Sequence, residues 1–209
     1  MTNIKIKDKW LLYALKNEVG KTLTKKNLAN ITYLDWSEYR DEAGETWSPI
    51  GDIQGLEYCT NLEVLSFDGN SVSDLSPLSG LKKLKEIWLV DNAVEDVSPI
   101  SKLPNLEKLV LDLNSHLIDI SPLSSLPSIK YINISNTSVR DITPLQNLNT
   151  LEKLGLYIDK LDISPGSKNR DVLIKLINKG VQVKNSRLEE LIKEIKLKKK
   201  KKIKKKKKE

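Results

Sequence analysis

The sequence predicts an α/β solenoid, a right-handed superhelix of similar turns whose strands build one parallel sheet. Three features recur with a period of 21 to 23 residues: an aspartate, a Ser/Thr-Pro pair and a spaced aliphatic triplet. The recurring aspartates are Asp52, Asp74, Asp96, Asp119, Asp141 and Asp162. Self-similarity at a fixed period of this length is the signature of a solenoid.

The aliphatic triplets predict the strands. Their last part alternates apolar and polar residues, which is typical of a short strand with one buried face. The triplets are Leu62/Leu65/Phe67, Leu84/Ile87/Leu89, Leu106/Leu109/Leu111, Ile129/Ile132/Ile134 and Leu151/Leu154/Leu156. Stacked units of this kind place their strands side by side in a parallel sheet.

The Ser/Thr-Pro pairs predict the short helical turns that lead from one strand to the next. The hydroxyl can cap free amides, and proline presets the first helical φ. The pairs are Ser76-Pro77, Ser98-Pro99, Ser121-Pro122, Thr143-Pro144 and Ser164-Pro165.

An asparagine column at Asn70, Asn92 and Asn114 follows three of the strands. An amide side chain donates and accepts at once, so it can join backbone groups of neighbouring turns. Thr137 and Asp159 occupy this column in the last two units. We therefore expect a looser ladder there.

The pattern L-x-x-L-x-L followed by Asn is the leucine-rich repeat, and it resembles the 22-residue repeats of bacterial internalin-like proteins. The resemblance covers Ile6 to Val183. It implies a helical N-terminal cap, a concave parallel sheet and a C-terminal cap helix. Terminal units need such covers because an uncapped solenoid exposes its core.

Both caps can be placed from apolar periodicity and stop signals. A helix over Asp8 to Val19 ends at Gly20, and a second short helix begins after Thr24. At the other end, a helix over residues 171–177 precedes a glycine and a closing strand over residues 179–183.

The expected organisation has five parts. Residues 1–53 hold the N-terminal cap and first strand, with an aromatic insertion at 36–49, and residues 54–165 hold the repeats. Residues 166–184 form the C-terminal cap helix and strand. Residues 185–197 predict an amphipathic helix whose apolar stripe either docks on the solenoid or meets a partner or membrane. Its stripe is Leu188, Leu191, Ile192 and Ile195. Residues 198–209 are a lysine-rich tail.

Charge is concentrated at the C-terminus. Residues 193–209 hold 12 Lys and 2 Glu, or +10, so the other 192 residues carry 23 Lys/Arg against 26 Asp/Glu, or −3. The run from Lys198 to Lys208 repels itself and cannot form a core, so we expect it to be disordered. Two interpretations remain open: a solubilising tail, or weak contact with an anionic membrane or nucleic acid.

Residues suited to catalysis are scarce. His116 is the single histidine, which leaves no material for a histidine metal cluster or a Ser-His-Asp arrangement. Cys59 falls in an aliphatic column and is expected to be a buried thiol. The aspartate column either accepts hydrogen bonds from turn amides or holds a row of cations. We predict a protein that is not an enzyme and binds no cofactor.

The concave face consists of the outward-pointing residues of the strands and the outward residue that follows each strand. Solenoids usually meet their ligands there. We expect Trp88, Val90 and Val110 to form an apolar centre with a polar surround, as binding hot spots do. The candidate contact residues are Ser66, Asp68, Glu86, Trp88, Val90, Lys108, Val110, Asp112, Tyr131, Asn133 and Tyr157. In the insertion, Trp36, Tyr39 and Trp47 either contact a partner or seal the cap.

The sequence thus predicts a protein–protein interaction module that binds a partner on its concave face. The resemblance identifies no ligand contacts, since outward residues of internalin-like proteins vary with the partner. Two alternatives remain: a regulatory scaffold similar to the nuclear phosphatase-regulating leucine-rich repeat proteins, and tethering through the tail. Without a membrane-spanning run or a secretory signal, we expect a cytoplasmic monomer, or a nuclear one in a eukaryote.

Overall fold

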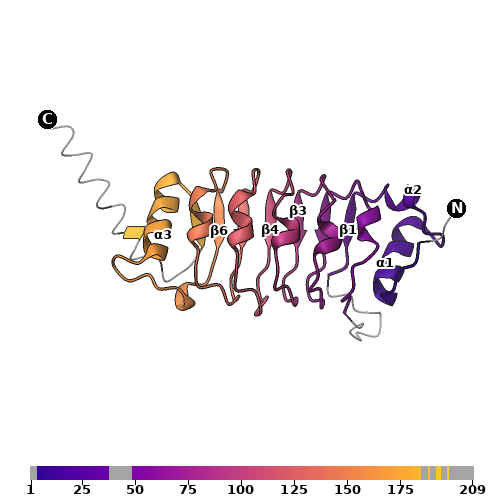
Figure 1. The fold of residues 1–209 in the computed structure, drawn as a ribbon, viewed down its shortest axis with the longest axis horizontal. Helices are drawn as coiled ribbons and strands as arrows, with labels where there is room; N and C mark the ends of the chain where they lie inside the picture. Colours follow the sequence, from indigo (N-terminus) through magenta and orange to yellow (C-terminus); the bar gives the residue numbers. More distant parts are fainter. Residues whose placement is uncertain (1–3, 38–48, 185–187, 189–191, 194–196, 198–209) are drawn as a thin grey trace.

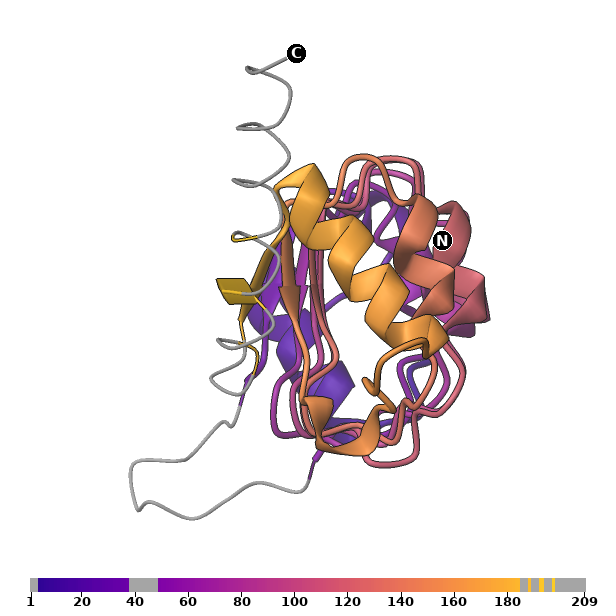
Figure 2. The same cartoon turned by 90° about the vertical axis from the view of Figure 1, so that its left-hand side faces the viewer.

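The computed structural model describes residues 4–37, 49–184, 188, 192–193 and 197 of the 209-residue chain. Within these residues the strands form one parallel sheet in sequence order. They are β1 (Tyr33–Asp35), β2 (Val64–Ser66), β3 (Glu86–Trp88), β4 (Lys108–Val110), β5 (Tyr131–Asn133), β6 (Lys153–Gly155) and β7 (Gln182–Lys184). They follow one another along the molecule, with the helical turns on the opposite side (Figures 1 and 2). The predicted α/β solenoid is confirmed.

The core is a stack of aliphatic residues, one from the centre of each strand. The strands pair in register, so each central residue lies beside its counterpart in the next strand. In order, they are Leu34, Leu65, Ile87, Leu109, Ile132, Leu154 and Val183. The first six are at most 1% exposed. Neighbouring turns therefore bury one another's apolar side, and no turn has a complete core of its own.

Short 3₁₀ helices connect the strands. They are η1 (Leu56–Tyr58), η2 (Ser76–Leu78), η3 (Ser98–Ile100), η4 (Ser121–Ser125), η5 (Thr143–Asn147) and η6 (Ile158–Lys160). Four of them begin at a Ser/Thr-Pro pair, as predicted. The fifth pair, Ser164-Pro165, was wrongly predicted to begin one. There the chain has already completed η6 and bends towards the C-terminal helix.

The aspartate of each repeat accepts from the backbone amide two residues later. Asp74 Oδ1 accepts from the Ser76 amide at 2.8 Å, and Asp74 Oδ2 accepts from Ser76 Oγ at 2.9 Å. Asp96 binds Ser98 in the same way, at 2.8 and 2.7 Å. The prediction that the hydroxyl caps the helical turn is wrong here. The hydroxyl donates to the aspartate, and the next amides of the turn, those of Leu78 and Ser79, donate to the carbonyls of Leu75 and Ser76 at 3.0 and 3.2 Å. The aspartate column thus accepts hydrogen bonds from turn amides, which is one of the two roles considered for it.

The asparagine ladder joins consecutive turns as predicted. Asn114 Oδ1 accepts from the Val94 amide of the preceding turn at 2.9 Å. Asn114 Nδ2 donates to Leu89 O at 2.7 Å and to Leu111 O at 3.0 Å. Asn70 and Asn92 likewise accept from an amide twenty residues earlier and donate to carbonyls of both turns.

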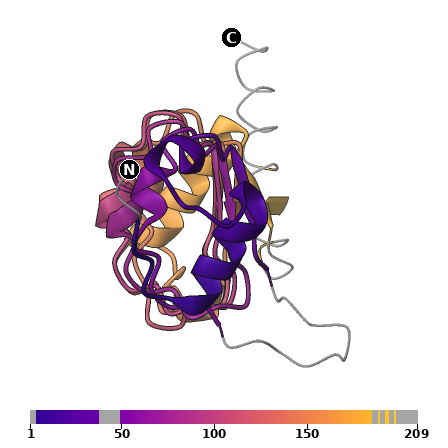
Figure 3. The ribbon, with the colours of Figure 1, turned by 90° about the vertical axis from the view of Figure 1, so that its right-hand side faces the viewer.

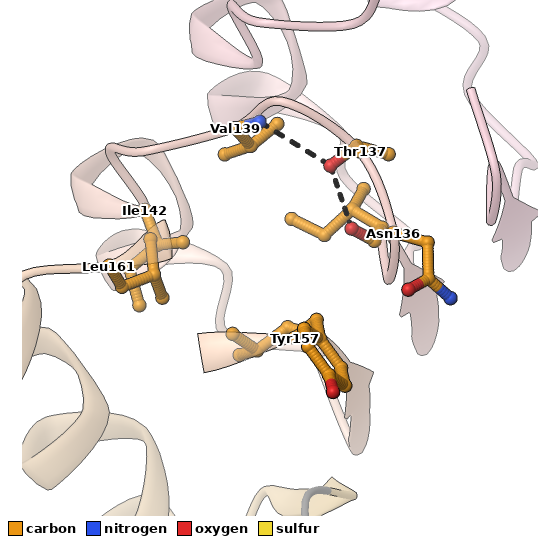
Figure 4. Close-up of a pocket in the computed structure, with 8 residues that line it drawn as sticks. Asn136, Thr137, Val139, Ile142, Tyr157 and Leu161 are labelled. Atoms are coloured by element: carbon orange, nitrogen blue, oxygen red, sulfur yellow. Dashed lines mark hydrogen bonds between the residues drawn. The ribbon is translucent and has the colours of Figure 1, made fainter. Parts of the chain in front are cut away.

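The ladder is interrupted at Thr137, where the sequence predicted loosening (Figure 4). Thr137 Oγ1 donates to Ile134 O at 2.8 Å and accepts from the Val139 amide at 3.4 Å. Both partners belong to its own turn. A cavity of about 10 Å³ lies beside it, lined in part by Val139 and Tyr157, and this is about the smallest space that holds one water. The shorter threonine therefore leaves the neighbouring turns less directly joined.

Two helices cover the N-terminal end, α1 (Lys9–Val19) and α2 (Lys25–Leu28) (Figure 3). Asp8 caps α1, and its Oδ1 accepts from the amides of Trp10 and Leu11, both at 2.9 Å. Its Oδ2 accepts from the Gly51 amide at 3.0 Å. One carboxylate thus begins the helix and joins it to the first repeat. Gly20, at φ 85°, ends α1, and Thr24 caps α2, as predicted.

The helix α3 (Lys168–Lys179) crosses the C-terminal end of the solenoid (Figures 1 and 2). It begins three residues before the predicted start, because Ser167 caps it by accepting from the Arg170 amide at 3.3 Å. Asn169 is buried and joins α3 to the preceding repeat. Its Oδ1 accepts from the Ile142 amide at 3.0 Å, and its Nδ2 donates to Arg140 O at 2.9 Å.

Part of the predicted amphipathic stripe packs onto the fold. Leu188 is fully buried, and Ile192 packs against the same core. Leu191, Ile195 and the tail of residues 198–209 lie outside the described residues. The buried Leu188 and Ile192 agree with docking of the stripe on the last turns.

Candidate interaction surface

The concave face presents three outward rows that run along the sheet. The first residues of the strands form one row: Tyr33, Val64, Glu86, Lys108, Tyr131 and Lys153. The third residues form the next: Asp35, Ser66, Trp88, Val110, Asn133 and Gly155. The residues two positions further on form the last row: Asp68, Val90, Asp112, Ser135 and Tyr157. Parallel strands lie about 4.8 Å apart, so side chains of one row can touch.

Trp88 lies near the middle of this face and is held on two sides. Its indole Nε1 donates to Glu86 Oε2 at 3.0 Å, and Lys108 Nζ donates to the same oxygen at 2.9 Å. The Lys108 ammonium also lies 4.9 Å from the centroid of the Trp88 ring, within range of a cation–π interaction. The partly exposed ring is thereby oriented before any ligand arrives.

The electrostatics of Glu86 support this arrangement. Partial burial by itself would raise the pKa of Glu86. Hydrogen bonds from Lys108 and Trp88, with the charge of Lys108, outweigh that effect, so the pKa of Glu86 lies below its ordinary value. Glu86 therefore stays ionised around neutral pH and keeps both donors.

Val110 is the clearest correction to the predicted surface. It is only 3% exposed, although its side chain belongs to the outward row. In register, it lies between Trp88 and Asn133, whose larger side chains flank it in the adjacent strands. The expected apolar centre is thus reduced to Trp88 and Val90, both partly exposed, with Val110 forming the floor between larger neighbours.

Gly155 leaves room for a neighbouring side chain in the C-terminal half of the face. A Cβ atom at Gly155 would overlap the side chain of Asn133. Asn133 uses this space, and its Oδ1 accepts from Ser135 Oγ at 2.7 Å and from the Ser135 amide at 3.1 Å. Tyr131 is partly exposed, and Tyr157 is 50% exposed. The predicted Tyr131, Asn133 and Tyr157 thus share this half.

Several carboxylates of the face also bind the chain itself. Asp68 Oδ1 accepts from the Val90 amide at 2.7 Å, and Asp112 Oδ1 accepts from Asn136 Nδ2 at 3.0 Å. These contacts join neighbouring turns. The predicted Asp68 and Asp112 therefore have a structural role besides any contact with a partner.

The N-terminal end of the face holds an aromatic residue that the predicted set omitted. Tyr33 is 55% exposed, and its hydroxyl donates to Asp35 Oδ2 at 3.0 Å. That hydrogen bond and the charge of Asp35 raise the pKa of Tyr33. Ser37 Oγ lies 2.7 Å from Ser66 Oγ. The position of Tyr33 in the outward row was the signal that could have included it.

Trp36 seals the cap. It is 8% exposed, and its ring meets Tyr13 of α1 edge to face, with centroids 5.7 Å apart. Of the two interpretations of the insertion, burial therefore favours packing for this residue, and Trp36 is removed from the contact set. Tyr39 and Trp47 lie outside the described residues.

The described residues offer little for catalysis. Cys59 is buried, and the loss of solvation raises the pKa of its thiol to about 12. His116 is exposed. Within the described residues, no group of three His, Cys, Asp or Glu side chains is placed to hold a metal ion. No helix among them is long and apolar enough to cross a membrane.

Comparison with known proteins gives the same fold. The family model for two copies of the leucine-rich repeat matches residues 60–102, 82–125 and 104–147. The crystal structure of an internalin, inlF, from Listeria monocytogenes is 28% identical with a TM-score of 0.57, and the match covers 81% of this chain and 53% of that chain. This chain therefore spans about half of that structure's length. No match was found among curated protein sequences.

A second internalin structure, inlC2 of L. monocytogenes, is 28% identical with a TM-score of 0.55, and the match covers 87% of this chain and 88% of that one. The repeat geometry and the family model define a leucine-rich repeat protein. Within this class, the chain is internalin-like, since it is similar to the two internalin structures over most of its length. This fold is generally a protein-interaction module.

Proposed function

We propose that the chain is a non-enzymatic module that binds a protein partner through its concave face, with Trp88 as the central anchor. One observation carries the proposal: a partly exposed tryptophan in the middle of the sheet is fixed by a hydrogen bond to Glu86 and by the Lys108 ammonium at its ring. Anchors at protein interfaces are enriched in tryptophan, and they lie near the interface centre.

This arrangement favours binding because the side chains are ordered before a partner arrives. Ordering a long side chain at an interface costs roughly 0.5 to 1.5 kcal/mol. Trp88 and Lys108 are already partly ordered by each other and by Glu86, so less of this free energy is lost on binding. Glu86 and Lys108 neutralise each other, so a partner can cover the ring without burying an unpaired charge.

Tyrosines extend the surface on both sides of Trp88. Tyr33 lies towards the N-terminal cap, and Tyr157 lies towards the C-terminal cap; each is at least half exposed. Tyrosine combines a large apolar contact area with a polar hydroxyl, so it suits a surface that is hydrated until a partner binds. A partner that spans the sheet would therefore meet an aromatic residue at each end and one at the centre.

Partner capture from native extract, with the purified full chain as bait, tests this proposal. We expect Trp88→Ala to lose a protein that the wild type retains specifically, with binding weakened by about thirtyfold or more, the size of a strong anchor. Ile118→Ala is the matched control, because Ile118 is 66% exposed but lies outside the outward rows. Circular dichroism shows whether both variants keep the fold.

Two results would contradict the proposal. One is equal capture by Trp88→Ala and the wild type. The other is loss of capture only when residues 198–209 are deleted, which would transfer recognition to the tail.

A further inference from the structure

Three lysines in and beside the strands are paired with a glutamate of the preceding turn. Each glutamate lies 22 or 23 residues before its lysine, so the pair joins neighbouring strands. The pairs are Lys85–Glu63, Lys108–Glu86 and Lys130–Glu107, with nitrogen–oxygen distances of 2.8, 2.9 and 2.8 Å. The chain thus compensates these cations internally, and a partner need not supply an acid for them.

Lys153 departs from this rule. It is the first residue of β6, and the register places Tyr131 beside it on the preceding strand, at the position where the other lysines meet glutamate. Gln182 lies beside it on the following strand. Lys153 is exposed, and among the described residues its ammonium forms no salt bridge. Its charge is therefore available to a ligand of the concave face.

The carboxylate nearest to Lys153 in the chain acts elsewhere. Glu152 precedes it, and the pKa of Lys130 is raised first by the hydrogen bond to Glu107 and further by the charge of Glu152. Glu152 thus belongs to the row of alternating charges that precedes the strands. On the outward rows, the neighbours of Lys153 in β5 are Tyr131 and Asn133, which are both neutral.

A single available ammonium matches a carboxylate better than it matches a polyanion. Nucleic acid gains its affinity from many phosphate contacts, and one lysine offers only one. The face also carries Asp68 and Asp112, which would repel a row of phosphates. An aspartate or glutamate of a protein needs only one cation, and such charge complementarity fixes register and rejects wrong partners.

Trp88 and Lys153 lie far enough apart to be two separate points of contact. Their strands, β3 and β6, are three strand spacings apart along the solenoid (Figure 1), or about 14 Å. An extended chain covers that distance in about four residues. Between them Val110 is buried, so it does not stand in the way of a segment that touches both.

We propose that the partner of the concave face is an acidic protein segment that makes two contacts. An apolar side chain covers Trp88, and an aspartate or glutamate about 14 Å away pairs with the Lys153 ammonium. The missing glutamate of the β5 turn is thereby supplied by the partner. This inference rests on the proposed function, because Trp88 is the first of the two contacts.

Paired selection from a random peptide display library tests the proposal, with the full chain as target in about 0.1 M salt. One selection uses the wild type and the other uses Lys153→Glu. Both chains have the same lysine-rich C-terminus, so peptides held there appear equally in both. We expect peptides specific to the wild type to carry Asp or Glu about four residues from an apolar residue. Lys153→Glu should select Lys or Arg at that place.

A peptide specific to the wild type then serves as the probe in titration calorimetry. Lys153→Gln should weaken its binding about tenfold. Lys130→Gln, the same change at an internally paired lysine, should alter it less than about twofold. Lys153→Arg keeps the charge and should bind within about twofold, which excludes a folding defect at this position. Replacing the acidic residue of the peptide by its amide should weaken binding to the wild type but not to Lys153→Gln.

The proposal is overturned if the two selections yield the same peptides, whether or not these are acidic. An equal loss in Lys130→Gln and Lys153→Gln would also overturn it, because total charge would then explain the binding. Trp88→Ala separates this inference from the proposed function. Loss of probe binding with Trp88→Ala but not with Lys153→Gln would contradict the Lys153 contact alone. The reverse would contradict the proposed anchor, and with it the two-point contact.

Discussion

Asn114 and Thr137 hold equivalent positions in consecutive turns, yet they connect the solenoid differently. The side chain of Asn114 is fully buried and binds backbone groups of two turns, whereas the side chain of Thr137 binds only its own turn, beside a small cavity. Stability in a repeat protein is approximately a sum of neighbour terms. The interface between the Thr137 turn and the preceding turn should therefore be weaker than the interfaces that the asparagine ladder joins. Trp88 lies in the part of the solenoid that the ladder joins.

The largest expected effect comes from removing the buried amide. Asn114→Ala leaves the Val94 amide and the Leu89 carbonyl without their partner, and each buried unsatisfied group costs about 1 to 3 kcal/mol. We expect the free energy of unfolding, measured with urea, to fall by about 3 to 5 kcal/mol. Thr137→Ala, the matched change, should cost only about 1 kcal/mol. Equal losses would show that the two positions contribute alike.

Restoring the ladder should strengthen the weak interface. Thr137→Asn introduces a longer amide that can reach the preceding turn, as the side chain of Asn114 does. A net gain of about 1 kcal/mol in the free energy of unfolding is expected, the value of one additional hydrogen bond. A decrease would mean that the turn has closed around threonine too tightly to admit the amide.

A smaller gain in the free energy of unfolding is expected from a substitution at Leu113, which lies after β4 and directly before Asn114. Its φ is 63°, in the left-handed region where the equivalent positions hold Gly69, Asp91 and Asn136. A bulky side chain is strained there, and Leu113 is also 46% exposed. Leu113→Asn should raise the free energy of unfolding by about 0.5 to 1 kcal/mol. The reverse change, Asn136→Leu, should lower it, and thermal melts of both variants check the pair.

The smallest expected effect is on how the free energy of unfolding changes with pH. Hydrogen bonds from the Ser98 amide and hydroxyl lower the pKa of Asp96 below its ordinary value of 3.8. The stabilisation is therefore complete above that pH and is lost as pH falls through the folded value. Asp96→Asn keeps an acceptor without the charge. Its free energy of unfolding should fall less steeply than that of the wild type between about pH 5 and 2. Parallel curves would exclude this contribution.

The strands of the repeats, the ends of the two N-terminal helices and the asparagine ladder could be predicted, because each follows from local periodicity or from a residue with a special backbone role. The closing strand, predicted over residues 179–183, lies at Gln182–Lys184. The errors involve competition between groups that meet only in the fold. Ser76 carries a good capping hydroxyl, but Asp74 lies in reach, and the hydroxyl donates to its carboxylate instead of capping the turn. Val110 points outward, yet larger neighbours from the flanking strands bury it. Asn169, on α3, binds the Ile142 amide of the last full repeat, a contact that no repeat alignment indicates.

The repeated pattern by itself determined the solenoid, its register and the direction in which each strand residue points, because a fixed period forces equivalent residues of successive turns to stack. Only the tertiary structure decided which outward residues are accessible and how they are held. That outcome depends on the relative sizes and charges of side chains from separate turns. The Trp88 ring, for example, is held in place because Glu86 and Lys108, on adjacent strands, bind it together.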